Sequence, residues 1–431
     1  MNQQIVKRDG RVVDFNREKI EKAILKAFIA VDGNTTEYAV EKANKIANYI
    51  ESVNEETPLS VEQIQDLVEA GLMNTRRKDV ARAYITYRNE RTLERERNSN
   101  LIKTVKEKIL ARNVQNQNAI VDEHSFGGRM GEANSAIMKQ YALNYCLSAK
   151  AKYNHLNNRV YTHDLDHYPV GDHNCLSIPF DDLLVNGFNT RQTDVRPAQS
   201  VSTAFQLVAV IFQLQSLQQF GGVSATHLDW TMVPYVRKSF LKHFVEGMLW
   251  VVGTHDPETY HYFKKNVEGT IDVTETSIND PVYTQYKDAH EYAYAKTVKE
   301  IYQAVEAMYH NLNTLQSRSG NQLPFTSINY GTCTLEEGRL VSKALIETSI
   351  KGIGKLHKTS IFPCNIFQCM KGVNRKPGDP NYDLFKLALK STSLRLYPNY
   401  ANVDWSGNAG YDVNDPTTYF STMGKWKMQL I

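Results

Sequence analysis

The feature that most constrains the fold is an alternation of short strand-like runs with long helical segments, which continues over roughly 300 residues. Apolar residues recur at helical spacing after Pro197 and over residues 288–316, 336–350 and 383–396. A polar loop at 317–332 leads into a strand-like run, and TSIFPCNIFQ has the composition of another strand. This alternation favours a large α/β barrel over a β-sandwich.

The part of this region that precedes Pro197 is less regular. Residues 100–130 are polar and are expected to form a linker and a strap, and helical periodicity resumes over 135–154. RVYTHDLDHYP, residues 159–169, is expected to be a short strand. GDHNCLSIPF, residues 171–180, is expected to be a second short apolar segment.

The N-terminal segment predicts a β-hairpin followed by a helix. Two β-prone runs in residues 3–15 flank Asp9-Gly10, a pair typical of a type I′ hairpin turn. Asn16 then stands where a helix N-cap is expected.

Three further helical segments follow the first one. Ser60 and Gln63 have the spacing of a capping box at the start of one of them. The last helical segment continues into RNERTLERERN, a charged stretch that is expected to be a linker. Residues 1–95 are therefore predicted to form one domain, a hairpin plus about four helices.

The composition is that of an ordinary soluble globular protein. The chain has 431 residues, 42% of them hydrophobic and 23% charged, with a net charge of +3. No apolar run approaches the length of a membrane span, the N-terminus does not resemble a signal peptide, and no general affinity for nucleic acid is expected. Five irregularly spaced cysteines argue against a disulfide framework and favour a reducing, cytoplasmic location.

Two segments of the sequence resemble known binding motifs but lack residues that those motifs need. KGIGKLHKT has Ser349 and Leu356 where a P-loop needs glycine and Ser or Thr. Cys364 and Cys369 form a C-x4-C pair without a second pair, so we predict no zinc site there.

The remaining candidates have ordinary alternatives. Basic side chains beside the first helix N-terminus could bind an anion or could simply be solvated. Cys175 could be a reactive thiol or a small buried side chain. His163, with nearby carboxylates, could be a ligand or part of a hydrogen-bonded strand end.

The N-terminal segment resembles an ATP-cone, the nucleotide-sensing domain that precedes the catalytic domain of many ribonucleotide reductases. VKRDGRVVDFNREKIEKAI and VARAYITYRNER carry the resemblance, which covers residues 3–92. It implies regulation in which ATP permits activity and dATP stops it. The positions that match the ATP/dATP-contacting residues of the family are Val6, Lys7, Arg8, Asn16 and Lys19.

A second resemblance begins where the first ends. YTHDLDHYPVGDHNCLS, SVSTAFQLVAVIFQLQSLQQFGGVSATHLDW, QSRSGNQLPFTSINYGT, HKTSIFPCNIFQCMKGVN and DPNYDLFKLALKSTSLRLYPNY are similar to the anaerobic, class III ribonucleoside-triphosphate reductases. The resemblance spans roughly residues 100–424. It implies the first part of a ten-stranded α/β barrel in residues 96–424 and a homodimer with a specificity site at the dimer contact. Helices near 197–220 and 234–250 are the candidates for that contact.

The resemblance also implies radical chemistry on the ribose. A thiyl radical abstracts the 3′-hydrogen, the 2′-hydroxyl leaves as water, and formate or a thiol system supplies electrons. The motif GDHNCLS places a second, sugar-facing cysteine at Cys175, and His163 is a candidate for the substrate pocket. A radical S-adenosylmethionine activase is the expected partner that generates the radical.

The match stops just before the thiyl cysteine of the family. Met423 and Gly424 match the substrate loop, but position 425 is lysine. The family's glycyl-radical motif and its four-cysteine zinc site have no match, so residues 425–431 are expected to be a tail foreign to the family.

Three explanations stay open for this ending. The chain could be the N-terminal part of an interrupted or split reductase gene, a finished regulatory nucleotide-binding protein, or a half-enzyme completed by a separate C-terminal fragment. We favour the first, because the resemblance is unbroken up to Gly424. A half-barrel exposes strand edges and apolar faces that the missing half would cover, so we expect the chain alone to be aggregation-prone or partly disordered. We also expect it to be unable to reduce a ribonucleotide.

Overall fold

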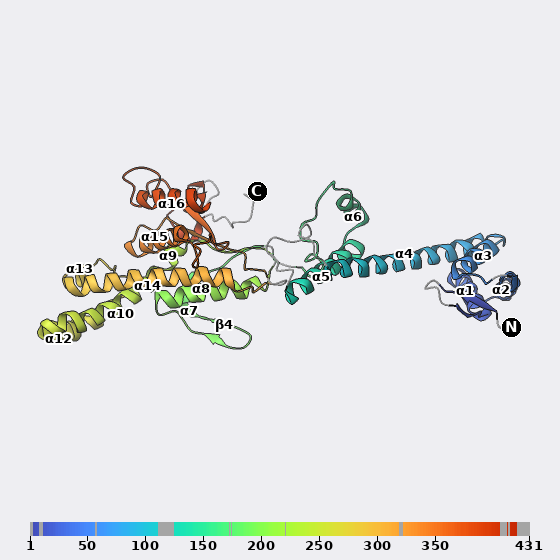
Figure 1. Ribbon diagram of the computed structural model, residues 1–431, viewed down its shortest axis with the longest axis horizontal. Helices are drawn as coiled ribbons and strands as arrows, with labels where there is room; N and C mark the ends of the chain where they lie inside the picture. Colours follow the sequence, from blue (N-terminus) through green and yellow to red (C-terminus); the bar gives the residue numbers. More distant parts are fainter. Residues whose placement is uncertain are drawn as a thin grey trace. The chain divides into compact units, whose positions relative to one another are not determined.

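The chain divides into two compact units, Met1–Val105 and Lys106–Ile431 (Figure 1). The computed structural model describes residues 3–7, 12–56, 58–110, 125–171, 173, 175–219, 221–318, 322–405, 412 and 414–419. The domain boundaries at residues 95 and 424 stay predictions.

The N-terminal unit contains the predicted hairpin and helices. Strands β1 (Gln4–Val6) and β2 (Val12–Asp14) pair antiparallel, with Ile5 opposite Val13. The turn residues Asp9 and Gly10 lie outside the described residues. The helices that follow are α1 (Arg17–Asp32), α2 (Glu37–Glu56), α3 (Val61–Met73) and α4 (Lys78–Ile109).

Local capping fixes where two of these helices begin, as the sequence predicts. The side chain of Asn16 accepts a hydrogen bond from the Lys19 amide at 3.1 Å, which closes the first turn of α1. Ser60 and Gln63 form the complete capping box of α3. The helices enclose a core of large aliphatic and aromatic side chains that includes Ile24, Phe28, Ile50, Val68 and Leu72.

The charged stretch at 88–98 is helical, and its role as a linker stays a prediction. It forms part of α4, because arginine, glutamate and leucine are good helix formers. Arg91 and Glu94 also pair at 3.0 Å along the helix. Arg88 bonds to three carboxylates of α3, those of Glu62, Asp66 and Glu69, at 2.7–3.0 Å.

The second unit begins with helices, as the helical periodicity over 135–154 predicts, but the first of them starts within the predicted strap. Helix α5 (Phe126–Tyr141) starts nine residues before the predicted 135, with Ser125 as its N-cap. A π-turn, η2 (Ala142–Cys146), and α6 (Ala149–Leu156) follow. Residues 159–169 form turns rather than a strand, because no other described strand pairs with them.

A five-stranded parallel sheet organises the rest of this unit. Its order is β3 (Leu176–Ser177), β6 (Val223–Ala225), β7 (Thr326–Tyr330), β8 (Cys364–Cys369) and β9 (Asn399–Asn402). Two short strands, β4 (Phe188–Asn189) and β5 (Asp194–Val195), form a separate antiparallel pair after α7 (Phe180–Asn186).

Long helices connect the strands, as the helical periodicity predicts. They are α8 (Val201–Ser216), α10 (Val233–Gly247), α14 (Lys287–Thr314), α15 (Glu336–Lys351) and α16 (Tyr382–Arg395). The shorter elements are α9 (Leu228–Thr231), η3 (Met248–Val252), α11 (Gly253–His255), α12 (Pro257–Asn266), η4 (Glu268–Thr270), α13 (Pro281–Thr284) and η5 (Pro416–Thr418). Helix α14 packs against α8, α10 and α15 (Figure 1).

The mixed α/β architecture with a parallel sheet is therefore confirmed. One large apolar core lies between the sheet and its helices and includes Phe205, Phe240, Ile328 and Phe367. None of the described helices is both long enough and apolar enough to cross a membrane.

Candidate functional site

The two faces of the parallel sheet differ in chemistry. Successive residues of a strand point to opposite faces, and register partners on parallel strands share a face. Ile328 and Phe367 belong to the apolar core beneath the helices, so Ser327 and Gln368 point to the opposite face. The strand residues on that opposite face include five neutral polar side chains, which we call the polar face: Ser177, Ser224, Ser327, Asn329 and Gln368.

Three serines of the polar face form one row. Ser177 of β3 is the register partner of Ser224 of β6, and Ser224 is the partner of Ser327 of β7. Ser224 and Ser327 are buried, and Ser177 is exposed. The amide of Asn329 donates to the hydroxyl of Ser224 at 3.1 Å. The serine row thus presents neutral hydroxyl groups across three adjacent strands.

Cys175 lies beside the serine row. It is half-buried and stands two residues before Ser177, on the same side of the sheet. Its Sγ accepts a hydrogen bond from the amide of Gly222 at 3.3 Å. This arrangement brings a thiol together with a row of hydroxyl groups.

The other cysteines have different surroundings. Cys333 is fully buried, and burial together with the nearby Asp229 raises the pKa of its thiol. Burial also raises the pKa of Cys369. A raised pKa keeps both thiols protonated, so neither is poised as a thiolate.

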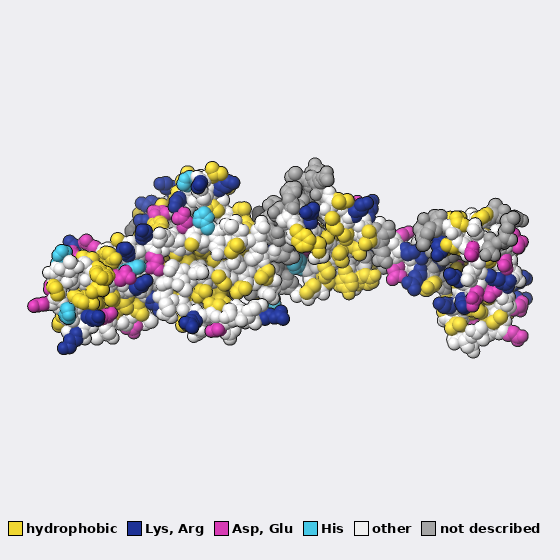
Figure 2. Space-filling model, turned by 60° about the horizontal axis from the view of Figure 1, so that its bottom comes forward, with side chains coloured by type: hydrophobic (Ala, Val, Ile, Leu, Met, Phe, Trp, Pro, Cys, Tyr) yellow, Lys and Arg dark blue, Asp and Glu magenta, His cyan; other side chains and the backbone are white. Residues whose placement is uncertain are grey.

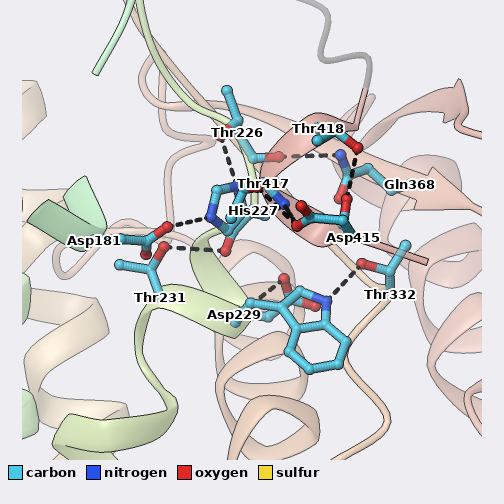
Figure 3. Close-up of polar contacts among 11 residues, drawn as sticks. Asp181, Thr226, His227, Asp229, Thr231, Thr332, Gln368, Asp415, Thr417 and Thr418 are labelled. Carbon is cyan, nitrogen blue, oxygen red and sulfur yellow. Dashed lines mark hydrogen bonds and ion pairs between the residues drawn. The ribbon is translucent and has the colours of Figure 1, made fainter. Parts of the chain in front are cut away.

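A hydrogen-bonded chain follows the carboxyl end of β6 (Figure 3). His227 Nε2 lies 2.5 Å from Asp181 Oδ2, and His227 Nδ1 lies 2.7 Å from the hydroxyl of Thr226. The side-chain amide of Gln368 donates a hydrogen bond to the backbone carbonyl of Thr226 at 3.0 Å. Burial opposes the ionisation of Asp181 more than any single contact favours it. The hydrogen bond and the charge interaction with His227 and the hydrogen bond with Thr231 together outweigh burial, and they lower the pKa of that carboxyl.

A buried carboxylate shapes the neighbouring loop after β7. Asp229 Oδ2 accepts from the amides of Gly331 at 2.8 Å and Cys333 at 3.0 Å. Complete burial raises the pKa of Asp229, although these amides oppose the rise. Asp415 lies near the same end of the sheet, where it interacts electrostatically with His227 (Figure 3).

His163 is not part of this arrangement. Its side chain is 73% exposed and contacts the carboxylate of Asp164. A cavity of about 680 Å³ is lined by its neighbours Thr162 and Asp164 and by His167, not by His163 itself. Its predicted role in a substrate pocket stays a prediction.

The predicted nucleotide-contacting residues lie in the N-terminal unit. Asn16 and Lys19 meet at the first turn of α1 through the capping hydrogen bond. Val6 ends β1, its amide donates to the carbonyl of Leu59 at 3.0 Å, and the next residue, Lys7, is exposed. The free amides of a helix N-terminus attract anions, and Lys19 adds a positive charge there.

A cavity of about 1120 Å³ adjoins this turn. It lies between α1, α3 and α4, and six of its lining residues are basic: Lys19, Lys22, Lys26, Arg88, Arg91 and Arg95. Basic and acidic side chains are interspersed on the face of this unit shown in Figure 2. The cavity is large enough for a nucleotide and suits an anionic one.

Arg8, Met423 and Gly424 lie outside the described residues. The other predicted residues fall into separate places, with Val6, Lys7, Asn16 and Lys19 in one unit and Cys175 and His163 in the other. Among the described residues, no group of three or more His, Cys, Asp and Glu side chains could hold a metal ion.

The sequence reasoning missed the serine row, Asp181, His227 and Gln368. A signal for the row exists, because the runs around Ser224 and Ser327 alternate apolar and small polar residues with the period of a strand. The sequence carries no comparable signal for the contact between Asp181 and His227, which are 46 residues apart.

Both units of the chain are similar to known protein families. Residues 117–424 match the family model described as anaerobic ribonucleoside-triphosphate reductase, and residues 3–93 match the ATP cone domain. The anaerobic ribonucleoside-triphosphate reductase of Escherichia coli is 30% identical over 430 residues, which is 99% of this chain and 55% of that protein. The protein of the same description from Haemophilus influenzae is 31% identical over 403 residues, or 93% of this chain and 52% of that protein.

The chain therefore spans about half the length of these curated relatives. Among solved structures, the anaerobic ribonucleotide reductase from Thermotoga maritima in complex with dATP and CTP is similar at a TM-score of 0.44 and 14% identity. That similarity covers 74% of this chain and 50% of the other.

Proposed function

Because this chain belongs to the anaerobic ribonucleoside-triphosphate reductase family, we propose that it supplies the regulatory unit and the first part of the catalytic region of such an enzyme. The overall reaction replaces the 2′-hydroxyl of a ribonucleoside triphosphate with hydrogen. With formate as the reductant, formate and one proton are consumed, and carbon dioxide and water are released. The observation that carries the proposal is the match of both units, in this order, to the ATP cone and to the reductase.

In this proposal Cys175 faces the sugar of the substrate and takes part in the reduction step. Its place on the same side of the sheet as the serine row supports this role, because a sugar is itself neutral and rich in hydroxyl groups. Half burial also shields the thiol of Cys175 in part from bulk water. The zinc of the family has no candidate group of ligands within the part of this chain that the structure describes.

The N-terminal unit binds ATP or dATP as an effector in this proposal. The phosphates lie at the first turn of α1, near Lys7, Asn16 and Lys19. The basic cavity between α1, α3 and α4 adjoins that turn and adds room for the anionic part of the ligand.

The proposed partners are a second copy of the chain and a radical S-adenosylmethionine activase, with a separate C-terminal fragment as a further possibility. The surface of α8 supports contact with a second copy. Leu214 of α8 is 40% exposed and Leu217, which follows the helix, is 59% exposed, although half of the residues of α8 are buried. Apolar side chains that remain exposed on a core helix suit a protein interface.

Calorimetric titration of the full chain tests the effector site. We expect Lys19→Gln to weaken ATP and dATP binding about tenfold, because it removes a charged hydrogen-bond donor to phosphate. Lys45→Gln is the matched control, since Lys45 is an exposed lysine of α2 in the same unit and does not line the basic cavity. Its affinity is expected to equal that of the wild type.

Equal loss of affinity in both lysine variants would show that only the net charge of the unit matters. Wild-type chain that binds neither ATP nor dATP would contradict the proposed effector role. A thermal melt of each variant verifies that the unit is folded.

A further inference from the structure

Ser327 has a hydroxyl group that the fold does not use. The residue lies in β7, the central strand of the sheet, and is 2% exposed. Its Oγ has no hydrogen-bond partner within the part of the chain that the structure describes. A buried hydroxyl without a partner costs stability, so it needs an explanation.

The register of the sheet shows which way this hydroxyl points. Ser327 is flanked in sequence by Thr326 and Ile328, which pair with Val223 and Ala225. Val223, Ala225 and Ile328 all belong to the core beneath the helices. Ser327 therefore points away from the core, to the side of the sheet that carries Cys175.

We propose that Ser327, with Ser224 beside it, positions the substrate by hydrogen bonding to a hydroxyl of its sugar. This inference rests on the proposed function, which assigns Cys175 to the sugar-facing side of the sheet. The serine row and Cys175 occupy neighbouring rows of that side, because Cys175 stands two residues before Ser177. A ligand that lies over Cys175 thus also lies over the row.

The chemistry of the polar face favours a sugar over a charged group. None of its five residues carries a charge, so it offers nothing that would hold a phosphate or a carboxylate by ion pairing. A serine hydroxyl both donates and accepts, and so does a sugar hydroxyl. The serine hydroxyl and the sugar hydroxyl can therefore form a hydrogen bond with either one as the donor.

The hydroxyl of Ser224 is oriented by a hydrogen bond and can bind the same ligand. Asn329 donates to its Oγ at 3.1 Å and also to the carbonyl of Ala225 at 2.9 Å. These contacts occupy an acceptor position of the Ser224 hydroxyl and leave its proton to be donated. Asn329 acts through Ser224 and is a positioning residue.

The neighbouring residue Thr326 provides a matched control. Thr326 is also 2% exposed, and its Oγ1 also has no hydrogen-bond partner among the described residues. Its side chain points to the opposite, helix-covered face, since its register partner Val223 is a core residue. Ser327→Ala and Thr326→Val therefore each delete a buried, unpartnered hydroxyl from one strand, but from opposite faces.

The test measures the binding of CTP, dCTP and 3′-deoxy-CTP to the full chain by saturation-transfer NMR. We expect Ser327→Ala to bind CTP about fivefold more weakly than the wild type, and Thr326→Val to bind it equally well. At least one of the two deoxy analogues is expected to bind equally to the wild type and to Ser327→Ala. That result locates the lost hydrogen bond on the deleted sugar hydroxyl.

Two outcomes would overturn the inference. One is equal CTP affinity of the wild type and Ser327→Ala. The other is no CTP binding by a wild-type chain that still binds ATP, which contradicts the sugar contact and leaves the effector site of the N-terminal unit standing. Thermal melts of both variants serve as the folding control, and neither deletion is expected to lower stability, because neither hydroxyl has a partner to lose.

Discussion

At the scale of single residues, Asp229 shows how one buried side chain fixes a loop. Its two oxygens accept hydrogen bonds from three backbone amides, those of Trp230, Gly331 and Cys333. These bonds hold the loop after β7 close to α9, at the carboxyl end of the sheet. Burial raises the pKa of Asp229 because it disfavours the charged carboxylate. The hydrogen bonds from the amides oppose this effect and stabilise the carboxylate in its buried position.

We predict that Asp229→Asn lowers the free energy of unfolding by about 2 kcal/mol. An asparagine has one acceptor oxygen, so its amide group would face a backbone N–H that needs an acceptor. Urea denaturation followed by tryptophan fluorescence measures the change.

Asp288→Asn is the control, because Asp288 is an exposed carboxylate in the first turn of α14. We expect its effect to stay within about 0.5 kcal/mol. Similar values for the two variants would contradict the role assigned to Asp229.

At the scale of elements, a histidine joins the two long helices α10 and α14. His243 Nε2 lies 2.9 Å from Glu300 of α14, and its Nδ1 lies 3.3 Å from Glu246 of its own helix. Glu300 also accepts from Ser239 of α10 at 3.2 Å. The hydrogen bond to Glu300 raises the pKa of His243, against the effect of burial.

This contact predicts a pH-dependent stability of the second unit. A raised pKa stabilises the fold fully below the ordinary histidine pKa of about 6.5, and this contribution is lost as pH rises through the folded-state value. We expect His243→Gln to cost about 1 kcal/mol at about pH 5.5 and less at about pH 9. Chemical denaturation at the two pH values measures the difference.

His310→Gln provides the comparison, because His310 lies on α14, the helix that carries Glu300. The side chain of His310 is 46% exposed and lies 3.9 Å from Glu306, so its pairing is screened by water. We expect its effect to be small at both pH values. A cost of His243→Gln that does not change with pH would contradict the pairing described here.

The helices could be predicted from the sequence because their signals are local. Asn16 and Ser60 cap their helices within three residues of themselves, and the apolar periodicity after Pro197 lies within one segment. A strand needs a partner from elsewhere in the chain, which a sequence window does not contain. Residues 159–169 have the composition of a strand but form turns.

The parts of the candidate site that depend on contacts between distant segments could not be predicted from the sequence. Cys175 could be singled out by its motif, whereas the serine row exists only through the register of three strands whose serines stand far apart in the sequence, at positions 177, 224 and 327. The pairing of Arg88 with α3, which supports the helical conformation of 88–98, likewise joins residues that are distant in the sequence.

At the scale of the whole molecule, the two units carry different chemistry. The N-terminal unit offers a helix N-terminus and a basic cavity, which suit an anionic nucleotide. The second unit offers a thiol beside neutral hydroxyl groups, which suits a sugar. In the proposed function the first site binds the effector and the second binds the substrate.

The second unit also has apolar surface that a partner could cover. Over α5, α6 and the turns after them, hydrophobic side chains gather on the surface (Figure 2). Phe126, Tyr161 and Val170 are each more than 70% exposed. Surface of this kind marks protein interfaces or causes aggregation.

We propose that the N-terminal unit of this reductase-family chain binds an adenine nucleotide. Hydrogen–deuterium exchange of the full chain with and without dATP is the decisive measurement, because it locates the bound nucleotide along the sequence. We predict slower exchange in β1, β2 and the first turns of α1, with no change in the sheet strands β6, β7 and β8. Unchanged exchange over β1 to α1 at saturating dATP, or protection confined to the sheet, would contradict the account.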